Sequence, residues 1–439
     1  MEIDTGDTAW LLMSSALVLL MTPGLAFFYG GMVRMKSVLN MIMMSFACIG
    51  VVSILWVAFG YSLTFTGTNP FIGTFEAAGL SGTIDAVSGT TPELAFVAFQ
   101  LMFAIITPAL ISGAIADRAK FGAWIVFAVL WSVLVYFPVA RWVFYFNDGD
   151  GGWIADRLQA LDFAGGTAVH INAGAAALAL TFVLGRRRGW PKDPMRPHNL
   201  PLVLLGASLL WFGWFGFNAG SALGANGLAA IAFINTQVAT AAAAMAWIVV
   251  EKIRDGHSTT LGVASGAVAG LVAITPACAA VDPVGAIIVG VVAGVLCSLA
   301  VGLKFKLGYD DSLDVVGVHL VGGLVGTLLI GFLATATVTG GVEGLFFGGG
   351  FTQLGKQAVA AGAVLAYSFI VTFIIGKVID LVIGFRVSEE DEETGVDVTT
   401  HAETGYDFGP VGAGGFSPTR SATSTATYDS ESVDRSVNA

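Results

Sequence analysis

The residues of this sequence that could carry chemistry inside a membrane are two histidines, His170 and His319. Each lies within a long apolar run, and each follows an aspartate on the same segment, Asp162 in one case and Asp314 in the other. An ionisable side chain within the bilayer is costly, so such residues mark functional sites by default. A neutral imidazole has one donor and one acceptor nitrogen, which suits the handling of protons. Packing is the alternative explanation for one buried histidine, whereas two at equivalent positions favour function.

The elements that position these histidines must be membrane helices. Of the 439 residues, 55% are hydrophobic and only 12% are charged, which is about half the charged fraction of a soluble protein. This composition excludes the soluble, fibrous and disordered classes, and the net charge of -11 excludes a nucleic-acid-binding protein. The class that remains is an all-α polytopic membrane protein.

Transmembrane helices are predicted wherever about 20 mostly apolar residues follow one another. Eleven such runs occur, at residues 10–33, 38–65, 94–116, 121–140, 163–184, 200–219, 227–250, 261–280, 284–303, 315–336 and 356–385. Glycines recur at every fourth position in one of them, at Gly262, Gly266 and Gly270. This spacing of small residues predicts close packing between helices.

The distribution of Lys and Arg predicts the orientation in the cell membrane. An odd number of spans places the two termini on opposite sides. With the N-terminus outside, only Arg141, Arg157 and Lys356 of the 20 basic residues lie on the outer side, and the other 17 lie inside. Cytoplasmic loops carry the excess of Lys and Arg. The sequence therefore predicts an external N-terminus and a cytoplasmic C-terminus.

The depths of the two histidines predict an inverted repeat. The fifth run enters from the outer side, which puts His170 about 12 Å below the boundary at Asp162. The tenth run enters from the inner side, which puts His319 about 7.5 Å above the boundary at Asp314. Five spans separate the two segments, so their polarities are opposite. We therefore predict an inverted repeat of spans 1–5 and 6–10, a site near mid-bilayer, and an additional helix 11.

Aromatic and small polar residues gather at the outer end of the sixth run, in the segment 211–221 (WFGWFGFNAGS). An interfacial aromatic belt accounts for most tryptophans. It does not account for the polar residues that follow Phe217 as far as Ser221. Aromatic faces beside a hydroxyl suit a small cation, because the ring quadrupole attracts positive charge.

The C-terminal segment has a different composition from the rest of the chain. Residues 386–439 contain 11 Asp and Glu against three Arg, so they carry -8 of the net charge of -11. The last part, residues 417–439, is rich in Ser and Thr and poor in apolar residues, which is typical of disorder. We therefore predict a transmembrane domain at 1–385 and a cytoplasmic acidic tail at 386–439.

Six segments of the sequence together resemble the ammonium transporter (Amt/Mep/Rh) family, in its Amt branch of archaeal or bacterial type. The segments are 23–34, 162–172, 197–201, 213–221, 275–278 and 310–319. The resemblance covers about residues 8–405 in order and its motifs are highly specific. It implies a homotrimer of eleven-helix subunits, each with its own central pore, and ammonium or ammonia as the substrate.

The resemblance implies an outer recruitment site for ammonium. Phe103 and Phe217 would be the stacked pair that closes the outer pore mouth, and Ser221 would accept a hydrogen bond from ammonium. The outer tryptophan of the family falls at Phe144, or at Trp153 if residues 145–150 are aligned differently.

The resemblance also implies roles within the pore. Trp214 would line the pore near the phenylalanine pair, and His170 and His319 match the twin pore histidines. Asp162 matches a structurally important acid near the recruitment site. We expect ammonium to be captured at the outer site and deprotonated, and ammonia to pass the two histidines.

The resemblance extends to the start of the tail, through residues 380–386 and 395–406. It implies that this region packs against the inner loops of neighbouring subunits and takes part in regulation by PII-type signal proteins. Two alternatives stand beside transport. One is an ammonium sensor in which transport is secondary, and the other is a membrane protein with a haem between His170 and His319. No nucleotide-binding loop, metal cluster or nucleophile motif occurs, so we predict neither an enzyme nor a cofactor nor a metal site.

Overall fold

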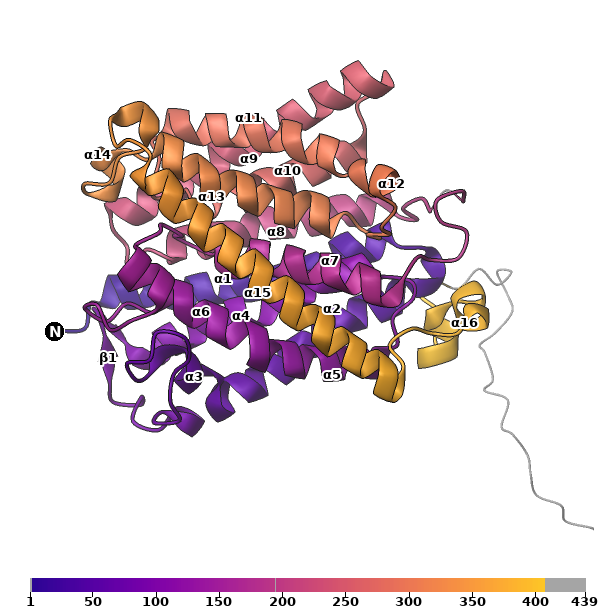
Figure 1. Cartoon of the computed structure of the whole chain (residues 1–439), viewed down its shortest axis with the longest axis horizontal. Coiled ribbons are helices and arrows are strands. Elements are labelled where there is room, and N and C mark those ends of the chain that lie inside the picture. Colours follow the sequence, from indigo (N-terminus) through magenta and orange to yellow (C-terminus); the bar gives the residue numbers. More distant parts are fainter. Residues whose placement is uncertain (1, 194, 407–439) are drawn as a thin grey trace, which may run out of the picture. The chain divides into compact units, whose positions relative to one another are not determined.

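Helices that run along one common direction make up almost all of the regular structure in this computed structural model (Figure 1). The structure describes residues 2–193 and 195–406, so the predicted disorder of residues 417–439 lies outside the described residues. The α-helices are α1 (Thr5–Met32), α2 (Val38–Leu55), α3 (Tyr61–Phe65), α4 (Glu93–Ile111), α5 (Phe121–Trp131), α6 (Phe137–Phe144), α7 (Asn172–Leu184), α8 (Leu200–Gly220), α9 (Gly227–Asp255), α10 (Thr260–Ile274), α11 (Pro283–Ala300), α12 (Leu303–Leu307), α13 (Val321–Leu333), α14 (Ala336–Thr339), α15 (Thr352–Ile383) and α16 (Glu389–Thr394).

Several of these helices are continued by π-helical or 3₁₀ turns. The π-helical segments are Trp56–Gly60, Ser132–Tyr136, Trp153–Leu158, Gly166–Ile171, Val316–Leu320 and Asp397–His401. The 3₁₀ segments are Met35–Ser37, Ala78–Leu80, Ser112–Ile115 and Leu345–Phe347. Two short antiparallel strands, β1 (Val87–Ser88) and β2 (Thr91–Pro92), pair Val87 with Pro92.

The predicted membrane spans are present as helices, with one difference in length. Among the described residues, ten helical stretches are long and apolar enough to cross a bilayer. The remaining predicted run, 261–280, forms the shorter helix α10, which ends at Ile274 and is followed by turns. Pro276 accounts for the early end, because proline cannot donate a helical hydrogen bond and its ring clashes with the preceding turn.

Small residues allow the helices to approach one another closely, as their spacing in the sequence predicts. Gly262, Gly266 and Gly270 line the face of α10 that packs on α9. A Cβ atom added to Gly266 would lie 2.7 Å from Trp247 Cβ, and one added to Gly270 would lie 2.6 Å from Ala243 Cβ. Both distances are shorter than real contacts allow, so larger residues at these positions would push the two helices apart.

The two halves of the chain pack against each other around the histidine segments. α1 from the first half packs along α8 from the second half. α7 packs against the π-helical segment that contains His319, and α13 packs against the one that contains His170. This reciprocal packing is what an inverted repeat of two five-span units requires.

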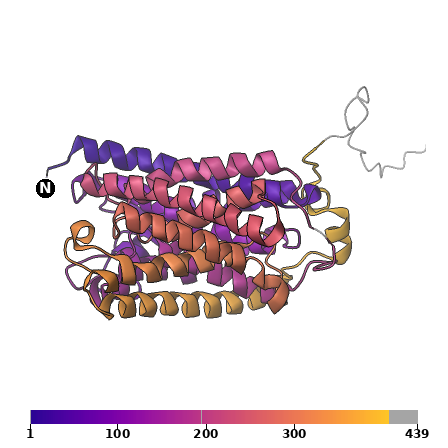
Figure 2. The ribbon, with the colours of Figure 1, turned by 90° about the horizontal axis from the view of Figure 1, so that it is seen from above.

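Helix α15, which corresponds to the last predicted run, lies outside this repeat. It crosses the bundle obliquely in Figure 1 and runs along one edge of it in Figure 2. It packs mainly against α7 and α13, the two helices that follow the histidine segments. The additional helix therefore supports both halves of the repeat.

The start of the acidic tail folds back onto the helical bundle. One compact unit extends to Gly405, which is 20 residues beyond the predicted domain boundary at Phe385. The side chain of Asp397 accepts hydrogen bonds from the backbone N–H groups of Leu39 and Asn40, at distances of 3.0 and 2.8 Å, and so caps the N-terminus of α2. These contacts lie within one chain. α16 and the N-terminus lie at opposite ends of the bundle (Figure 1).

Candidate functional site

The segment that carries His170 begins at a carboxylate cap. Asp162 Oδ1 accepts hydrogen bonds from the N–H groups of Gly165 and Gly166, at 2.8 and 2.7 Å. Its Oδ2 accepts from the N–H groups of Thr167 and Ala168, at 2.7 and 3.3 Å. The first N–H groups of a helix have no partner within the helix, so a carboxylate at this position stabilises the helix start. Asp162 thus holds the π-helical segment that presents His170.

The segment that carries His319 has an equivalent cap, which is Asp311 and not Asp314. Asp311 Oδ1 accepts from Val315 N–H at 3.1 Å, and its Oδ2 accepts from Val316 N–H at 2.7 Å. Asp311 precedes His319 by eight residues, the same interval that separates Asp162 from His170. Asp314, the nearest aspartate before His319 in the sequence, forms an ion pair of 2.6 Å with Lys304. The equivalent spacing of the two caps was the signal that sequence reasoning missed.

The two histidines meet in the buried middle of the bundle. Their Nδ1 atoms lie 3.3 Å apart, and their rings are stacked with centroids 5.3 Å apart. His170 is 1% exposed and His319 is 3% exposed, so both are shielded from solvent. Trp214 also stacks on His170, with the centroids of the two rings 5.4 Å apart. The structure therefore brings together three residues that the sequence assigned to one pore.

A narrow apolar void lies beside the histidine pair. Its volume of about 10 Å³ is close to the minimum that one water-sized molecule needs. Seven of its eleven lining residues are aliphatic or Met: Met21, Leu25, Ile106, Leu110, Val169, Leu210 and Val268. Such a lining favours a small neutral molecule, because an ion loses its hydration there without gaining equivalent partners.

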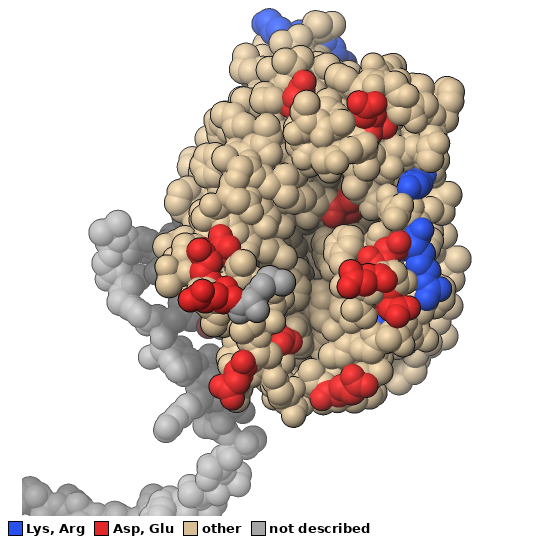
Figure 3. Space-filling model, turned by 90° about the vertical axis from the view of Figure 1, so that its left-hand side faces the viewer, with Lys and Arg blue, Asp and Glu red and all other residues tan. Residues whose placement is uncertain are grey.

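A larger cavity opens at the face of the bundle where α1 begins. We call it the N-terminal cavity; its volume is about 700 Å³, and Phe103, Phe144, Asp162, Ser221 and Lys356 are among its lining residues. Figure 3 shows this face, on which acidic side chains lie around a central hollow. Negative charge around an opening raises the local concentration of cations.

Two phenylalanines separate the N-terminal cavity from the histidine pair. The rings of Phe103 and Phe217 lie 4.2 Å apart at an interplanar angle of 36°, and both side chains are buried. Phe217 is also 6.1 Å from the ring of His170, on the inner side. Ser221 Oγ donates a hydrogen bond of 2.8 Å to Phe217 O, which leaves its lone pairs free to accept a hydrogen bond from a cation.

The wall of the N-terminal cavity contains Phe144 and not Trp153. The Phe144 ring lies 6.2 Å from that of Phe103, in an edge-to-face arrangement. Trp153 is absent from the cavity lining, and its ring packs against Phe71 and Trp142 at 6.5 and 5.8 Å. Of the two residues that the sequence left open, Phe144 is therefore the one that faces a cavity occupant.

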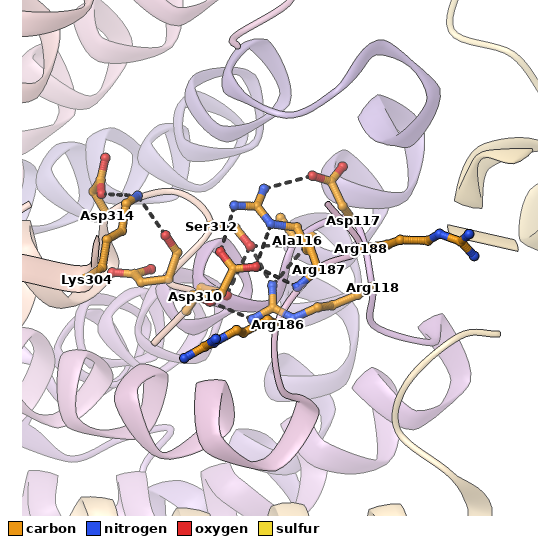
Figure 4. A network of polar contacts seen from close by, with 12 residues as sticks. Ala116, Asp117, Arg118, Arg186, Arg187, Arg188, Lys304, Asp310, Ser312 and Asp314 are labelled. Atoms are coloured by element: carbon orange, nitrogen blue, oxygen red, sulfur yellow. Dashed lines mark hydrogen bonds and ion pairs between the residues drawn. The ribbon is translucent and has the colours of Figure 1, made fainter. Parts of the chain in front are cut away.

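A buried ionic network holds the base of the His319 segment at the opposite face (Figure 4). Arg187 donates to both carboxylate oxygens of Asp310, at 3.0 and 2.8 Å, and to Asp117 at 3.1 Å. Burial opposes the charge of Arg187, but hydrogen bonds and attraction from Asp310 and Asp117 raise its pKa above the ordinary value. Arg118 donates to Asp310 O and Ser312 Oγ, both at 2.6 Å. Both residues that flank Asp311 are therefore fixed.

The same network reaches the start of the tail. Glu392 accepts a hydrogen bond of 2.8 Å from Arg188 N–H and pairs with Arg386 at 2.8 Å. It also lies 3.6 Å from Arg34, which in turn lies 3.4 Å from Asp117. A continuous set of polar contacts therefore joins α16 to the loop that precedes His319. Among the described residues, no group of three or more His, Cys, Asp and Glu is placed to hold a metal ion.

Comparison with known proteins decides the family. A sequence model described as Ammonium Transporter Family matches residues 9–406. The chain belongs to the ammonium transporter family. The function of this family is ammonium transport across a membrane, and the apolar helices of the chain make it a multi-pass membrane protein.

Relatives and solved structures of ammonium transporters resemble the chain over most of its length. The ammonium transporter of Mycobacterium tuberculosis is 60% identical, over 95% of this chain and 93% of the relative. The ammonium transporter Amt1 of Archaeoglobus fulgidus is 45% identical, over 91% of this chain and 99% of the length of Amt1. The crystal structure of Candida albicans Mep2 superposes with a TM-score of 0.82 at 35% identity, over 89% of this chain and 88% of Mep2. The predicted membership of the ammonium transporter family is confirmed.

Proposed function

We propose that the chain conducts ammonia through a pore at the centre of each subunit, after capturing ammonium in the N-terminal cavity. The observation that carries this proposal is the order of the groups along one path. The cavity comes first, followed by the Phe103–Phe217 pair and then the His170–His319 pair, with the apolar void beside the histidines. Membership of the ammonium transporter family supplies the substrate.

Capture of ammonium would use Ser221 and the aromatic wall formed by Phe103 and Phe144. The Ser221 oxygen has lone pairs available, and the ring faces can attract a partly desolvated cation. The acidic face around the hollow (Figure 3) would concentrate ammonium, and the same features would attract potassium. Capture alone therefore does not distinguish the two cations.

Selection would follow from the loss of a proton. A cation that enters the apolar void loses its hydration at a cost of several kcal/mol or more. Ammonium can avoid this cost by releasing a proton and entering as ammonia, whereas potassium has no proton to release. The void of about 10 Å³ suits a molecule of the size of water or ammonia.

The histidine pair would orient ammonia and handle the released proton. At an Nδ1–Nδ1 distance of 3.3 Å, one nitrogen must carry the proton and the other must accept it. The two neutral rings therefore take opposite tautomers. To exchange them, the proton that moves between the Nδ1 atoms must be matched by one gained at Nε2 of the ring that gives it up and one lost from Nε2 of the ring that receives it. The same contact opposes the haem alternative, because a porphyrin would have to fit between two rings that already touch.

The assembly and regulation of the transporter extend this proposal. The family resemblance supports a homotrimer. The excess of Lys and Arg at the α16 face supports an N-terminus outside the cell and a tail in the cytoplasm. The contacts of Glu392 with Arg188 and Arg386 support a regulatory role for residues 386–405, as a site that a PII-type protein would engage. A sensor function, with transport secondary, is not favoured. One solved sensor Amt protein is similar at only 27% identity, against 60% for the mycobacterial transporter.

Uptake of labelled methylammonium by vesicles, with and without an imposed membrane potential, tests the proposal. Movement of neutral ammonia alone predicts uptake that is independent of potential, and separate passage of the proton predicts uptake that is driven by a negative interior. In either case potassium should be excluded. Potassium currents of the same size as ammonium currents would refute the neutral passage.

A further inference from the structure

Gln357 on α15 forms hydrogen bonds with the backbone of Leu161, the residue before Asp162. Its side chain is 0% exposed. Its Oε1 accepts from Leu161 N–H and its Nε2 donates to Leu161 O, both at 2.7 Å. Nε2 also donates to Thr327 O at 3.1 Å, and Oε1 also accepts from Gln353 Nε2 at 3.0 Å. All four hydrogen-bonding positions of the amide are occupied.

The segment that Gln357 binds, residues 159–165, has no regular secondary structure. The φ angles at its two ends are positive, 57° at Gln159 and 116° at Gly165. Directly after Asp162, Phe163 N–H donates a hydrogen bond of 3.2 Å to Pro276 O, which links this segment to the turn that follows α10. The position of the Asp162 carboxylate therefore depends on contacts from other elements.

The other histidine segment is held in the same manner by a different residue. Arg118 binds Asp310 O and Ser312 Oγ on the two sides of Asp311, as Gln357 binds Leu161 beside Asp162. The difference is charge, because Arg118 is a cation and Gln357 is neutral.

We propose that Gln357 is a positioning residue for ammonium capture. It fixes Leu161 so that the Asp162 carboxylate meets the first N–H groups of the His170 segment, and so keeps that side of the N-terminal cavity in place. The eleventh helix would thereby contribute directly to substrate affinity. This inference rests on the proposed role of the cavity in capture.

The test compares Gln357→Leu, which keeps the volume but removes every hydrogen bond, with Thr372→Val as a matched control. Thr372 is also buried on α15, but its hydroxyl accepts from Trp131 Nε1 at 2.9 Å, away from the histidine segments. We expect Gln357→Leu to raise the KM for methylammonium about tenfold with less change in maximal rate, as the loss of the two hydrogen bonds to Leu161 implies. Hydrogen exchange of the N–H groups of residues 165–168 should accelerate by a similar factor, and the control should change neither.

A second variant, Gln357→Glu, separates positioning from packing through its pH profile. An ionised carboxylate can accept from Leu161 N–H but cannot donate to Leu161 O, whereas the protonated acid can do both. Burial raises the pKa of such a carboxyl, so the KM should approach that of the wild type near pH 5 and that of Gln357→Leu near pH 8. Methylammonium stays almost fully protonated throughout, because alkyl amines titrate near pH 10.

An unchanged KM and unchanged exchange in Gln357→Leu would overturn the proposal, as would an equal effect of Thr372→Val. If Gln357→Leu does not fold, a KM of Gln357→Glu that is independent of pH would overturn it. Ser221→Ala, measured in parallel, identifies failure of the capture site itself. If Ser221→Ala leaves the KM unchanged, the proposed function is at fault, whereas the exchange rates of residues 165–168 still report on Gln357.

Discussion

Removal of one histidine of the central pair should impair transport as much as removal of both. In the wild type the two Nδ1 atoms are 3.3 Å apart and satisfy each other in an apolar void. In His170→Ala or His319→Ala, the remaining Nδ1 loses its partner, at a cost of about 1–3 kcal/mol. A cost of this size corresponds to roughly a five- to 150-fold loss of ammonia passage. The double variant has no unpaired nitrogen left, so its loss should not exceed that of the worse single variant.

The asparagine variants provide a matched control. An asparagine side chain places its amide near the position of Nδ1, so His319→Asn should keep a partner for His170. We expect it to recover much of the loss that His319→Ala causes, whereas His319→Gln, whose amide reaches the position of Nε2, should recover less. Rescue by glutamine and not by asparagine would contradict the Nδ1 contact.

The assay is the rate of methylammonium uptake and the current in reconstituted membranes, each with ammonium or potassium. Two alanines in place of two imidazoles widen the passage enough for water, and a hydrated cation could then follow. Potassium should therefore compete in the double variant. If the effects of the single variants multiply in the double variant, or if the double variant transports ammonium at the wild-type rate and still excludes potassium, the histidines are packing residues.

Three further predictions concern capture, the second helix cap and the tail. Ser221→Ala should weaken ammonium capture by about 1–3 kcal/mol, because a hydrogen bond to a charged group is lost, and should raise the KM for methylammonium more than it lowers the maximal rate. Burial, with Asp314 nearby, raises the pKa of Asp311 from 3.8 to about 6, although Lys304 opposes the shift. The native state therefore holds the proton on Asp311 more tightly than the unfolded state does. Asp311 contributes up to about 3 kcal/mol to the free energy of unfolding below about pH 4, and this contribution is lost as the pH rises through about 6. Unfolding in detergent should show this decline in the wild type and not in Asp311→Asn. Deletion of residues 408–439 should leave transport nearly unchanged, whereas deletion from Arg386 should alter it and abolish binding of a PII-type protein.

Each of these has a result that would contradict it. A reduced maximal rate with an unchanged KM would remove Ser221 from the capture site. If the free energy of unfolding has the same pH dependence in the wild type and in Asp311→Asn, this carboxyl does not titrate between about pH 4 and about pH 6. Equal effects of the two truncations would contradict a division of function between residues 386–405, which contact the loops that carry Arg34 and Arg188, and the residues that follow.

The sequence was informative wherever one residue type was rare in its surroundings. Two histidines in otherwise apolar runs predicted a central pair, and hydrophobic runs predicted the helical bundle, because both signals depend on composition along a single segment. The sequence shows Asp314 five residues before His319 but not which aspartate caps the helix, because it does not show where the helix begins. The cap must precede the first unpaired N–H group, and Asp311 occupies that position while Asp314 binds Lys304.

Contacts between distant segments were beyond prediction from one sequence. Gln357 is one of several polar residues at the start of a long apolar helix, and nothing in its neighbourhood indicates that Leu161 is its partner. The end of α10 at Ile274 depends on Pro276, but a run of apolar residues continues past it and suggests a longer helix. The contacts of Asp397 with α2 likewise join residues more than 350 positions apart.

The π-helical turns at the two histidines bear on how the gene arose. A π turn differs from an α turn by one additional residue, and such turns originate most simply by a single-residue insertion. Here one turn ends just after His170 and the other just after His319, each at the same interval from its capping aspartate. Two independent insertions at matching positions require a coincidence that one event does not. One duplication of a five-span unit that already contained the turn and its histidine would account for both.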